Sequence, residues 1–106
     1  MKQGDLVVLA FPYADMTHSK WRPAVVISNE RYNARANVLL AGIYSKEQPF
    51  SIPIDNKDIL RGELRKLSYV SVQNIFSADK SVVKGPAGTL NASKLKEVLA
   101  TVRKCF

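Results

Sequence analysis

Apolar residues along this chain come in short runs separated by polar, turn-forming segments. Continuous apolar runs bounded by Gly or Pro are typical of buried strands, and two occur early, at 5–10 (DLVVLA) and 23–28 (PAVVIS). The same character predicts strands at 37–45 (NVLLAGIYS) and 67–76 (LSYVSVQNIF), and a short closing strand at 87–90 (AGTL).

Another strand is predicted at 49–54 (PFSIPI), where apolar residues alternate with other positions. Its Pro49 and Pro53 lack amide donors, so we expect this strand at the edge of a sheet. The segment 55–63 has room for one helical turn, which Gly62 would end.

Polar stretches predict the connections. About a dozen residues separate the first two predicted strands, and loops of that length tend to be functional. Residues 29–36 (NERYNARA) are polar and turn-rich, and residues 84–86 (KGP) are predicted to be a loop.

The end of the chain predicts a helix over 92–104. Asn91 is a favourable N-cap, and Leu90 and Leu95 occupy hydrophobic-staple positions. Apolar residues recur at helical spacing and form one stripe, made of Leu95, Val98, Leu99 and Val102. Several short strands followed by one helix predict a mainly β (α+β) domain spanning 1–106, either a small barrel or a strongly bent sheet with a packed helix.

The charge balance adds an anionic partner to this picture. The formal net charge is +7, and a small domain this basic often meets nucleic acid, although a solubilising lysine surface is the plainer explanation. With one Cys (Cys105), an internal disulfide is excluded, and the unpaired thiol suits the cytoplasm. One Cys and one His also argue against a structural zinc site. No apolar stretch is long enough to cross a membrane, and no phosphate-binding glycine motif is present, so we expect no cofactor.

Candidate chemistry gathers between the first two strands. Arg22 precedes Pro23, which favours extended geometry, and its guanidinium offers a planar fork of donors suited to phosphate, unless it pairs with Asp5 or Asp15. His18 is the side chain best suited to proton transfer near neutral pH, and a solvated loop histidine is the alternative. Arginine and a proton carrier are what metal-free RNA cleavage by the 2′-OH requires.

The chain resembles the MazF/PemK toxins of type II toxin–antitoxin systems over nearly its whole length. Their opening pattern is similar to Gly4-Asp5-Leu6-Val7, Phe11-Pro12-Tyr13 and 19–28 (SKWRPAVVIS). The later segments that fit are 42–45 (GIYS), 66–70 (KLSYV), 74–76 (NIF), 79–81 (DKS) and 88–90 (GTL).

This resemblance implies an SH3-like small β-barrel with a C-terminal α-helix. It also implies a homodimer that cleaves single-stranded RNA without metal, leaving a 2′,3′-cyclic phosphate and a 5′-OH, and an antitoxin with a flexible acidic tail as partner. The strand at 37–45 and the C-terminal helix ending in Phe106 are both candidate surfaces for the second copy.

The resemblance places Arg22 at the catalytic arginine and Tyr44 where the family has a threonine. Ser45 is the alternative hydroxyl, but a shift of one residue along a strand turns a side chain to the other face. His18 is the candidate acid or base. Further RNA-binding candidates, by position, charge or aromatic face, are Asp15, Lys20, Trp21, Lys46, Phe50, Ser71 and Gln73.

A second hypothesis is a non-catalytic binder on the same barrel. A relative of this fold poisons DNA gyrase, and a toxin that only binds RNA or antitoxin is equally compatible with a tyrosine at position 44. A cleavage assay separates these hypotheses.

Overall fold

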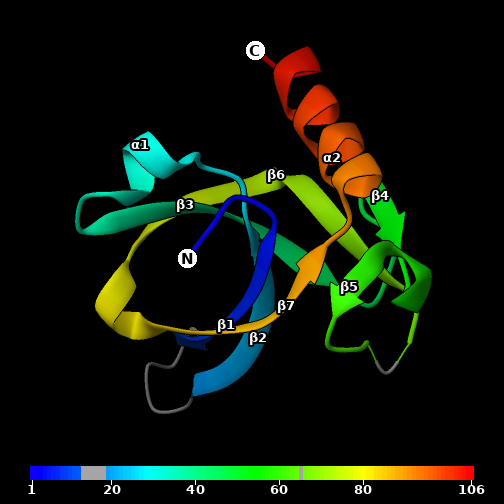
Figure 1. Ribbon diagram of the computed structural model, residues 1–106. Helices are drawn as coiled ribbons and strands as arrows, with labels where there is room; N and C mark the ends of the chain where they lie inside the picture. The colour runs from blue at the N-terminus through cyan, green and yellow to red at the C-terminus, as the bar shows by residue number, and fades with distance from the viewer. Residues whose placement is uncertain (13–18, 65) are drawn as a thin grey trace.

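One curled, antiparallel sheet forms most of the molecule (Figure 1). The computed structural model describes residues 1–12, 19–64 and 66–106. The strand order is β4-β6-β3-β2-β1-β7-β5, so the sheet is a half-barrel with β4 and β5 at its edges. The strands are β1 (Asp5–Pro12), β2 (Ser19–Val26), β3 (Asn37–Tyr44), β4 (Ser51–Ile54), β5 (Ile59–Arg61), β6 (Ser68–Asp79) and β7 (Val83–Leu90).

Four helical segments join or follow these strands. They are α1 (Glu30–Asn33), the 3₁₀ turns η1 (Asn56–Asp58) and η2 (Lys80–Val82), and α2 (Ala92–Lys104). The predicted β-rich domain with a C-terminal helix is confirmed, as is the edge position of the proline-containing strand β4. No helix within the described ranges is long and apolar enough to cross a membrane.

Strands β1 and β2 are longer than predicted. They pair from Leu6 opposite Val25 to Pro12 opposite Ser19, so only residues 13–18 lie between them rather than about a dozen. Trp21 and Arg22 therefore belong to β2. Polar residues can occupy a strand here because pairing with β1 satisfies their backbone groups, whatever their side chains prefer.

The two faces of the sheet carry separate apolar clusters. One cluster contains Leu6, Val25, Ala41 and Val70 and is covered by α2, whose Val98 is fully buried. Alternate residues of the same strands form the other cluster, which includes Val7, Ala24, Val26, Val38 and Leu40. Because side chains alternate between faces, continuous apolar runs such as DLVVLA supply both clusters.

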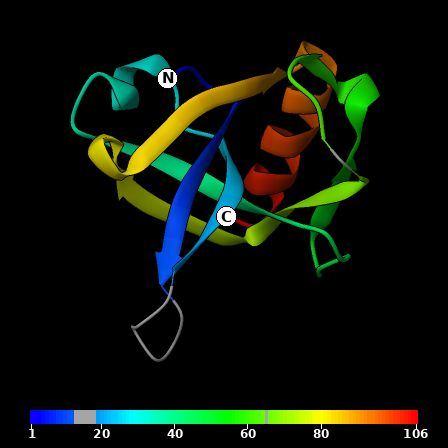
Figure 2. The same cartoon turned by 90° about the horizontal axis from the view of Figure 1, so that it is seen from below.

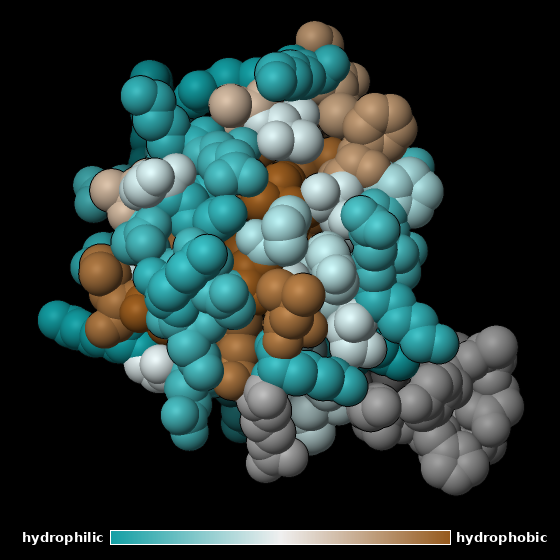
Figure 3. Space-filling model, turned by 90° about the vertical axis from the view of Figure 1, so that its right-hand side faces the viewer, coloured by the Kyte–Doolittle hydropathy of each residue, from teal (hydrophilic) through white to brown (hydrophobic). Residues whose placement is uncertain are grey.

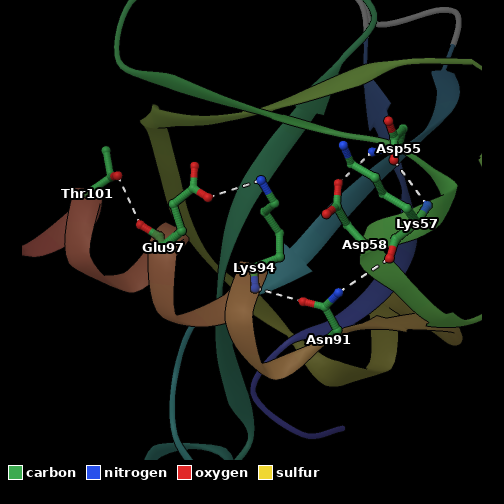
Figure 4. A network of polar contacts seen from close by, with 7 residues as sticks. All are labelled: Asp55, Lys57, Asp58, Asn91, Lys94, Glu97 and Thr101. Atoms are coloured by element: carbon green, nitrogen blue, oxygen red, sulfur yellow. Dashed lines mark hydrogen bonds and ion pairs between the residues drawn. The ribbon is translucent and has the colours of Figure 1, made fainter.

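Helix α2 begins as predicted. The Asn91 side chain accepts a hydrogen bond from the Lys94 amide, and Leu90 and Leu95 pack into the same cluster. Figure 4 shows that Asn91 also ties the helix to η1, because its Nδ2 donates to the Lys57 carbonyl at 3.3 Å. The backbone amide of Asn91 donates a second hydrogen bond, to the Asp58 carbonyl at 2.7 Å. This junction holds the first turn of α2 beside the β4–β5 connection.

One prediction near the end of the chain was wrong, and one short strand in the middle of the chain was not predicted. Residues 84–86 lie inside β7, where Lys84 pairs with Val8, rather than in a loop. Strand β5 was missed because three residues carry no periodic signal. It packs on β7 only because Gly88 lacks a side chain, since a Cβ there would lie 2.3 Å from the Arg61 carbonyl oxygen.

Strand β6 is longer than predicted and changes register at its middle. On β3, Ala41 pairs with Ile75 and Ile43 pairs with Val70. Gly42 alone therefore faces the four β6 residues from Ser71 to Asn74. The irregularity bends β6, and it brings Asn74 over β3 close to the candidate site.

Figure 2 shows α2 lying across one side of the sheet, with the paired strands β1 and β2 running away from it. At the far end of β6, the Ser81 amide donates to the Asp79 carboxylate at 2.8 Å and lowers the pKa of that carboxyl.

Figure 3 shows the side that carries β4 and β5, where apolar areas are interrupted by polar residues. Large apolar side chains exposed on the molecule include Leu60 and Phe106.

Candidate functional site

A hollow of about 310 Å³ opens where β3 ends and where β2 and β6 begin. It brings together four of the predicted site residues, from two neighbouring strands and the turn after β3. Its lining consists of Trp21, Arg22, Pro23, Ile43, Tyr44, Ser45, Leu64, Lys66 and Ser68. We call this hollow the Arg22 pocket.

Arg22 and Tyr44 project from the same face of the sheet. Ala24 pairs with Gly42, so these two residues share a face. Arg22 lies two residues before Ala24, and Tyr44 lies two residues after Gly42. Because the strands are antiparallel and every second side chain points to the same face, Arg22 and Tyr44 lie side by side on that face. Both side chains are half-buried, which leaves the guanidinium and the phenol partly open to a ligand.

Arg22 makes no ion pair with a carboxylate in the part of the chain that the structure describes. Asp5, one of its two predicted partners, instead accepts hydrogen bonds from the Thr89 hydroxyl and, at 2.8 Å, from the Lys2 amide. The other, Asp15, lies outside the described residues. The forked donors of Arg22 therefore remain free of Asp5 to bind an anion.

The Tyr44 hydroxyl has a partner on β6. The side-chain amide of Asn74 donates a hydrogen bond to it. Gly42 lies directly beneath this contact, because a Cβ at that position would be 2.8 Å from Asn74 Nδ2 and 3.3 Å from the Tyr44 hydroxyl oxygen. The phenol is thus held over β3.

Trp21 extends the site toward β7. Its side chain is 52% exposed, and Lys84 Nζ lies 5.8 Å from the centre of its ring. Trp21 pairs with the exposed Ala10, and Lys84 pairs with the half-buried Val8. Trp21 and Lys84 are both exposed. An exposed ring beside an ammonium group is suited to stacking a nucleobase and attracting its phosphate.

Other predicted residues are not gathered by the Arg22 pocket. Lys46 and Phe50 lie on the exposed turn after β3, and Phe50 has a positive φ of 54°. Gln73 is exposed on β6, whereas Ser71 is only 2% exposed and pairs with Ser51. Asp15 and His18 lie outside the described residues, as does the side chain of Lys20.

Sequence reasoning missed Asn74 and Lys84 as site residues. Asn74 is distant in sequence from Tyr44, and only the register change in β6 brings them together. Lys84 was assigned to a loop because it precedes Gly-Pro. Even a strand prediction over 83–90 would not have identified β1 as its neighbour, so the approach of Lys84 to Trp21 follows only from the observed pairing.

A larger hollow of about 820 Å³ lies at the opposite end of β3. Its lining residues are Asn29, Arg31, Tyr32, Arg35, Ala36 and Asn37. We place the site at the smaller Arg22 pocket because that pocket combines the arginine, a phenol and an exposed tryptophan. No group of three or more metal-binding side chains occurs among the residues that the structure describes.

Comparison with known families decides the classification. The model of the family described as PemK-like, MazF-like toxin of type II toxin-antitoxin system matches residues 2–106. The chain belongs to this toxin family. A search among curated proteins gives no match.

Solved structures of MazF toxins share the fold. The chain resembles a chain of the MazE–MazF crystal structure (form III) from Deinococcus radiodurans, with a TM-score of 0.78 and 22% sequence identity. The match covers 99% of this chain and 94% of that chain. It also resembles an endoribonuclease in complex with its cognate antitoxin from a mycobacterial species, with a TM-score of 0.74 and 18% identity, covering 98% and 95%. Toxin MazF-mt6 of Mycobacterium tuberculosis gives a TM-score of 0.67 at 22% identity, covering 91% and 90%.

Proposed function

We propose that this MazF/PemK-like toxin is a metal-independent endoribonuclease that cleaves single-stranded RNA. The observation that carries the proposal is the Arg22 pocket, where an arginine and a hydroxyl share one face at the mouth of the half-barrel. Family membership and the net charge of +7 support a polyanionic substrate.

The reaction uses the substrate's own nucleophile. The 2′-oxygen attacks the adjacent phosphorus, and the bond from phosphorus to the 5′-oxygen breaks. The 2′-OH gives its proton to a base, and an acid returns a proton to the leaving 5′-oxygen, so the products are a 2′,3′-cyclic phosphate and a 5′-OH. The protein needs only to hold the phosphate, stabilise its added charge and move these protons.

Arg22 is proposed to bind the scissile phosphate and stabilise the charge that builds on its oxygens in the transition state. Tyr44 donates a hydrogen bond to the same phosphate. His18 is the proposed proton carrier, since imidazole titrates closest to neutral pH. Trp21 stacks a base next to the cleaved bond, and Lys66 lies on the rim for a neighbouring phosphate.

The partners follow from the same proposal. The two complexes named above contain antitoxins, so we propose an antitoxin whose acidic tail competes with RNA for the Arg22 pocket. We propose that this occurs in the cytoplasm. We also propose a homodimer. Strand β3 lies between β2 and β6, so it has no free edge for a second copy, whereas Phe106 after α2 is 92% exposed.

The test is cleavage of a long single-stranded RNA by the purified protein in EDTA. We expect products with 5′-OH ends, and we expect Arg22→Ala to lower the rate by about a hundredfold or more, since a preorganised charge contact contributes several kcal/mol to transition-state stability. Arg35→Ala, at the other end of β3, is the matched control and should cleave normally. Normal cleavage by Arg22→Ala would reject the assignment.

Tight RNA binding without cleavage would favour the second candidate, a binder on the toxin fold. The tyrosine at position 44 is the observation that keeps this candidate in view.

A further inference from the structure

The contact between Asn74 and Tyr44 has a direction that matters for chemistry. Asn74 donates its amide hydrogen to the phenolic oxygen of Tyr44. A phenol carries one hydrogen of its own and can accept and donate at the same time. Because Asn74 occupies the oxygen as a donor, the Tyr44 hydrogen points elsewhere and remains available to a second acceptor.

Three features of the fold build this contact. The register change in β6 places Ser71 to Asn74 opposite Gly42, which brings Asn74 over β3. Gly42 leaves room for both side chains, since a Cβ there would lie 3.2 Å from ring atom Cε2 of Tyr44. Because Gly42 pairs with Ala24, the contact between Asn74 and Tyr44 lies on the face of the sheet that also carries Arg22.

The neighbour of Gly42 on β2 is also small. Ala24, which lies opposite Gly42, is fully buried and adds only a methyl group. Tyr44 and Arg22 lie one step further toward the open end of this pair of strands, on the same face. Both residues also line the Arg22 pocket.

We propose that Asn74 is a positioning residue, which holds the Tyr44 hydroxyl so that its hydrogen is donated to the phosphate bound by Arg22. This inference rests on the proposed ribonuclease function. Asn74 acts through Tyr44 and does not touch the RNA itself. A hydrogen bond accepted by the phenol also polarises its O–H and strengthens it as a donor.

The decisive variant is Asn74→Asp, which keeps the shape of the side chain but offers acceptors in place of the amide donor. Tyr44 would then donate its hydrogen to the carboxylate rather than to the phosphate. We expect kcat on a short single-stranded RNA to fall by about a hundredfold while KM stays within about threefold, because the lost interaction strengthens in the transition state. Tyr44→Phe, which removes the hydroxyl, should give a similar fall.

A double-mutant cycle separates positioning from direct contact. If Asn74 acts only through the Tyr44 hydroxyl, adding Asn74→Asp to Tyr44→Phe should cause no further loss of kcat. If Asn74 contacts RNA, or if the new charge merely repels phosphate, the two losses should multiply, which overturns the proposal. Asn37→Asp, exposed at the start of β3, adds the same charge away from the pocket and should cleave normally.

Gly42→Ala gives a second route to the same result. The added methyl separates Asn74 from Tyr44 without changing either residue, so kcat should fall while thermal unfolding shows a folded protein. Normal kcat in both Gly42→Ala and Asn74→Asp overturns the inference and leaves the ribonuclease proposal standing. Absence of cleavage by the wild-type protein overturns both.

Discussion

At the residue scale, the proposed function predicts that Trp21 contributes to RNA affinity. Trp21→Ala removes an exposed aromatic face, and base stacking is worth about 1–3 kcal/mol, so the Kd for a short single-stranded RNA should rise about 5- to 150-fold. Tyr32→Ala is the matched control, because Tyr32 is also an exposed aromatic residue but lies at the far end of β3. Equal Kd values for the two variants, measured by fluorescence anisotropy, would remove Trp21 from the site.

The difference between what could and could not be predicted at this scale has a physical origin. Arg22 was recognisable from the sequence as a candidate site residue, because its type, its place before Pro23 and the family pattern all point the same way. The Asn74–Tyr44 contact was not, because it depends on a register change across two strands that are distant in sequence. Side-chain partners of this kind follow from tertiary pairing, which local pattern does not encode.

At the scale of elements, Asn91 should stabilise the fold more than an ordinary N-cap. Its side chain caps α2 and also donates to the Lys57 carbonyl, so it joins the helix to η1. Losing a cap costs about 1 kcal/mol and losing a second hydrogen bond adds about 0.5–1.5 kcal/mol, so Asn91→Ala should lower the free energy of unfolding by about 1.5–2.5 kcal/mol. Urea denaturation measures this difference. Ser93→Ala, exposed in the first turn, should stay within about 0.5 kcal/mol of wild type.

Helix α2 was also the element that the sequence predicted best, to the residue at both ends. Its cap, staple and stripe are local signals that agree with one another. Strand β7 was predicted over only half its length, since Gly85 and Pro86 are usually turn residues. Pairing with β1 and β5 overrides that preference, and neither partner is visible from the local sequence.

At the scale of the whole molecule, the proposed function predicts different contributions of the net charge and of the Arg22 pocket to RNA binding. The net charge of +7 attracts any polyanion, whereas only cations that contact phosphate release counterions on binding. For single strands, each phosphate contact adds about 0.7 to the steepness with which log Kobs falls against log salt concentration. Salt dependence therefore counts contacts rather than overall charge.

The resulting prediction separates the phosphate contact of Arg22 from base stacking on Trp21. With an uncleavable 2′-deoxy RNA of a few nucleotides, Arg22→Gln should reduce that slope by about 0.7, because one phosphate contact is lost. Trp21→Ala should weaken binding and leave the slope unchanged, since stacking releases no counterions. Arg35→Gln removes the same charge as Arg22→Gln, but Arg35 lies just before the start of β3. Tyr44, at the Arg22 pocket, is the last residue of β3, and the strand rises by about 23 Å over the seven residues from Asn37 to Tyr44. If Arg35→Gln flattens the slope as much as Arg22→Gln does, the RNA is held by the general field of the domain, and the Arg22 pocket does not bind the phosphate.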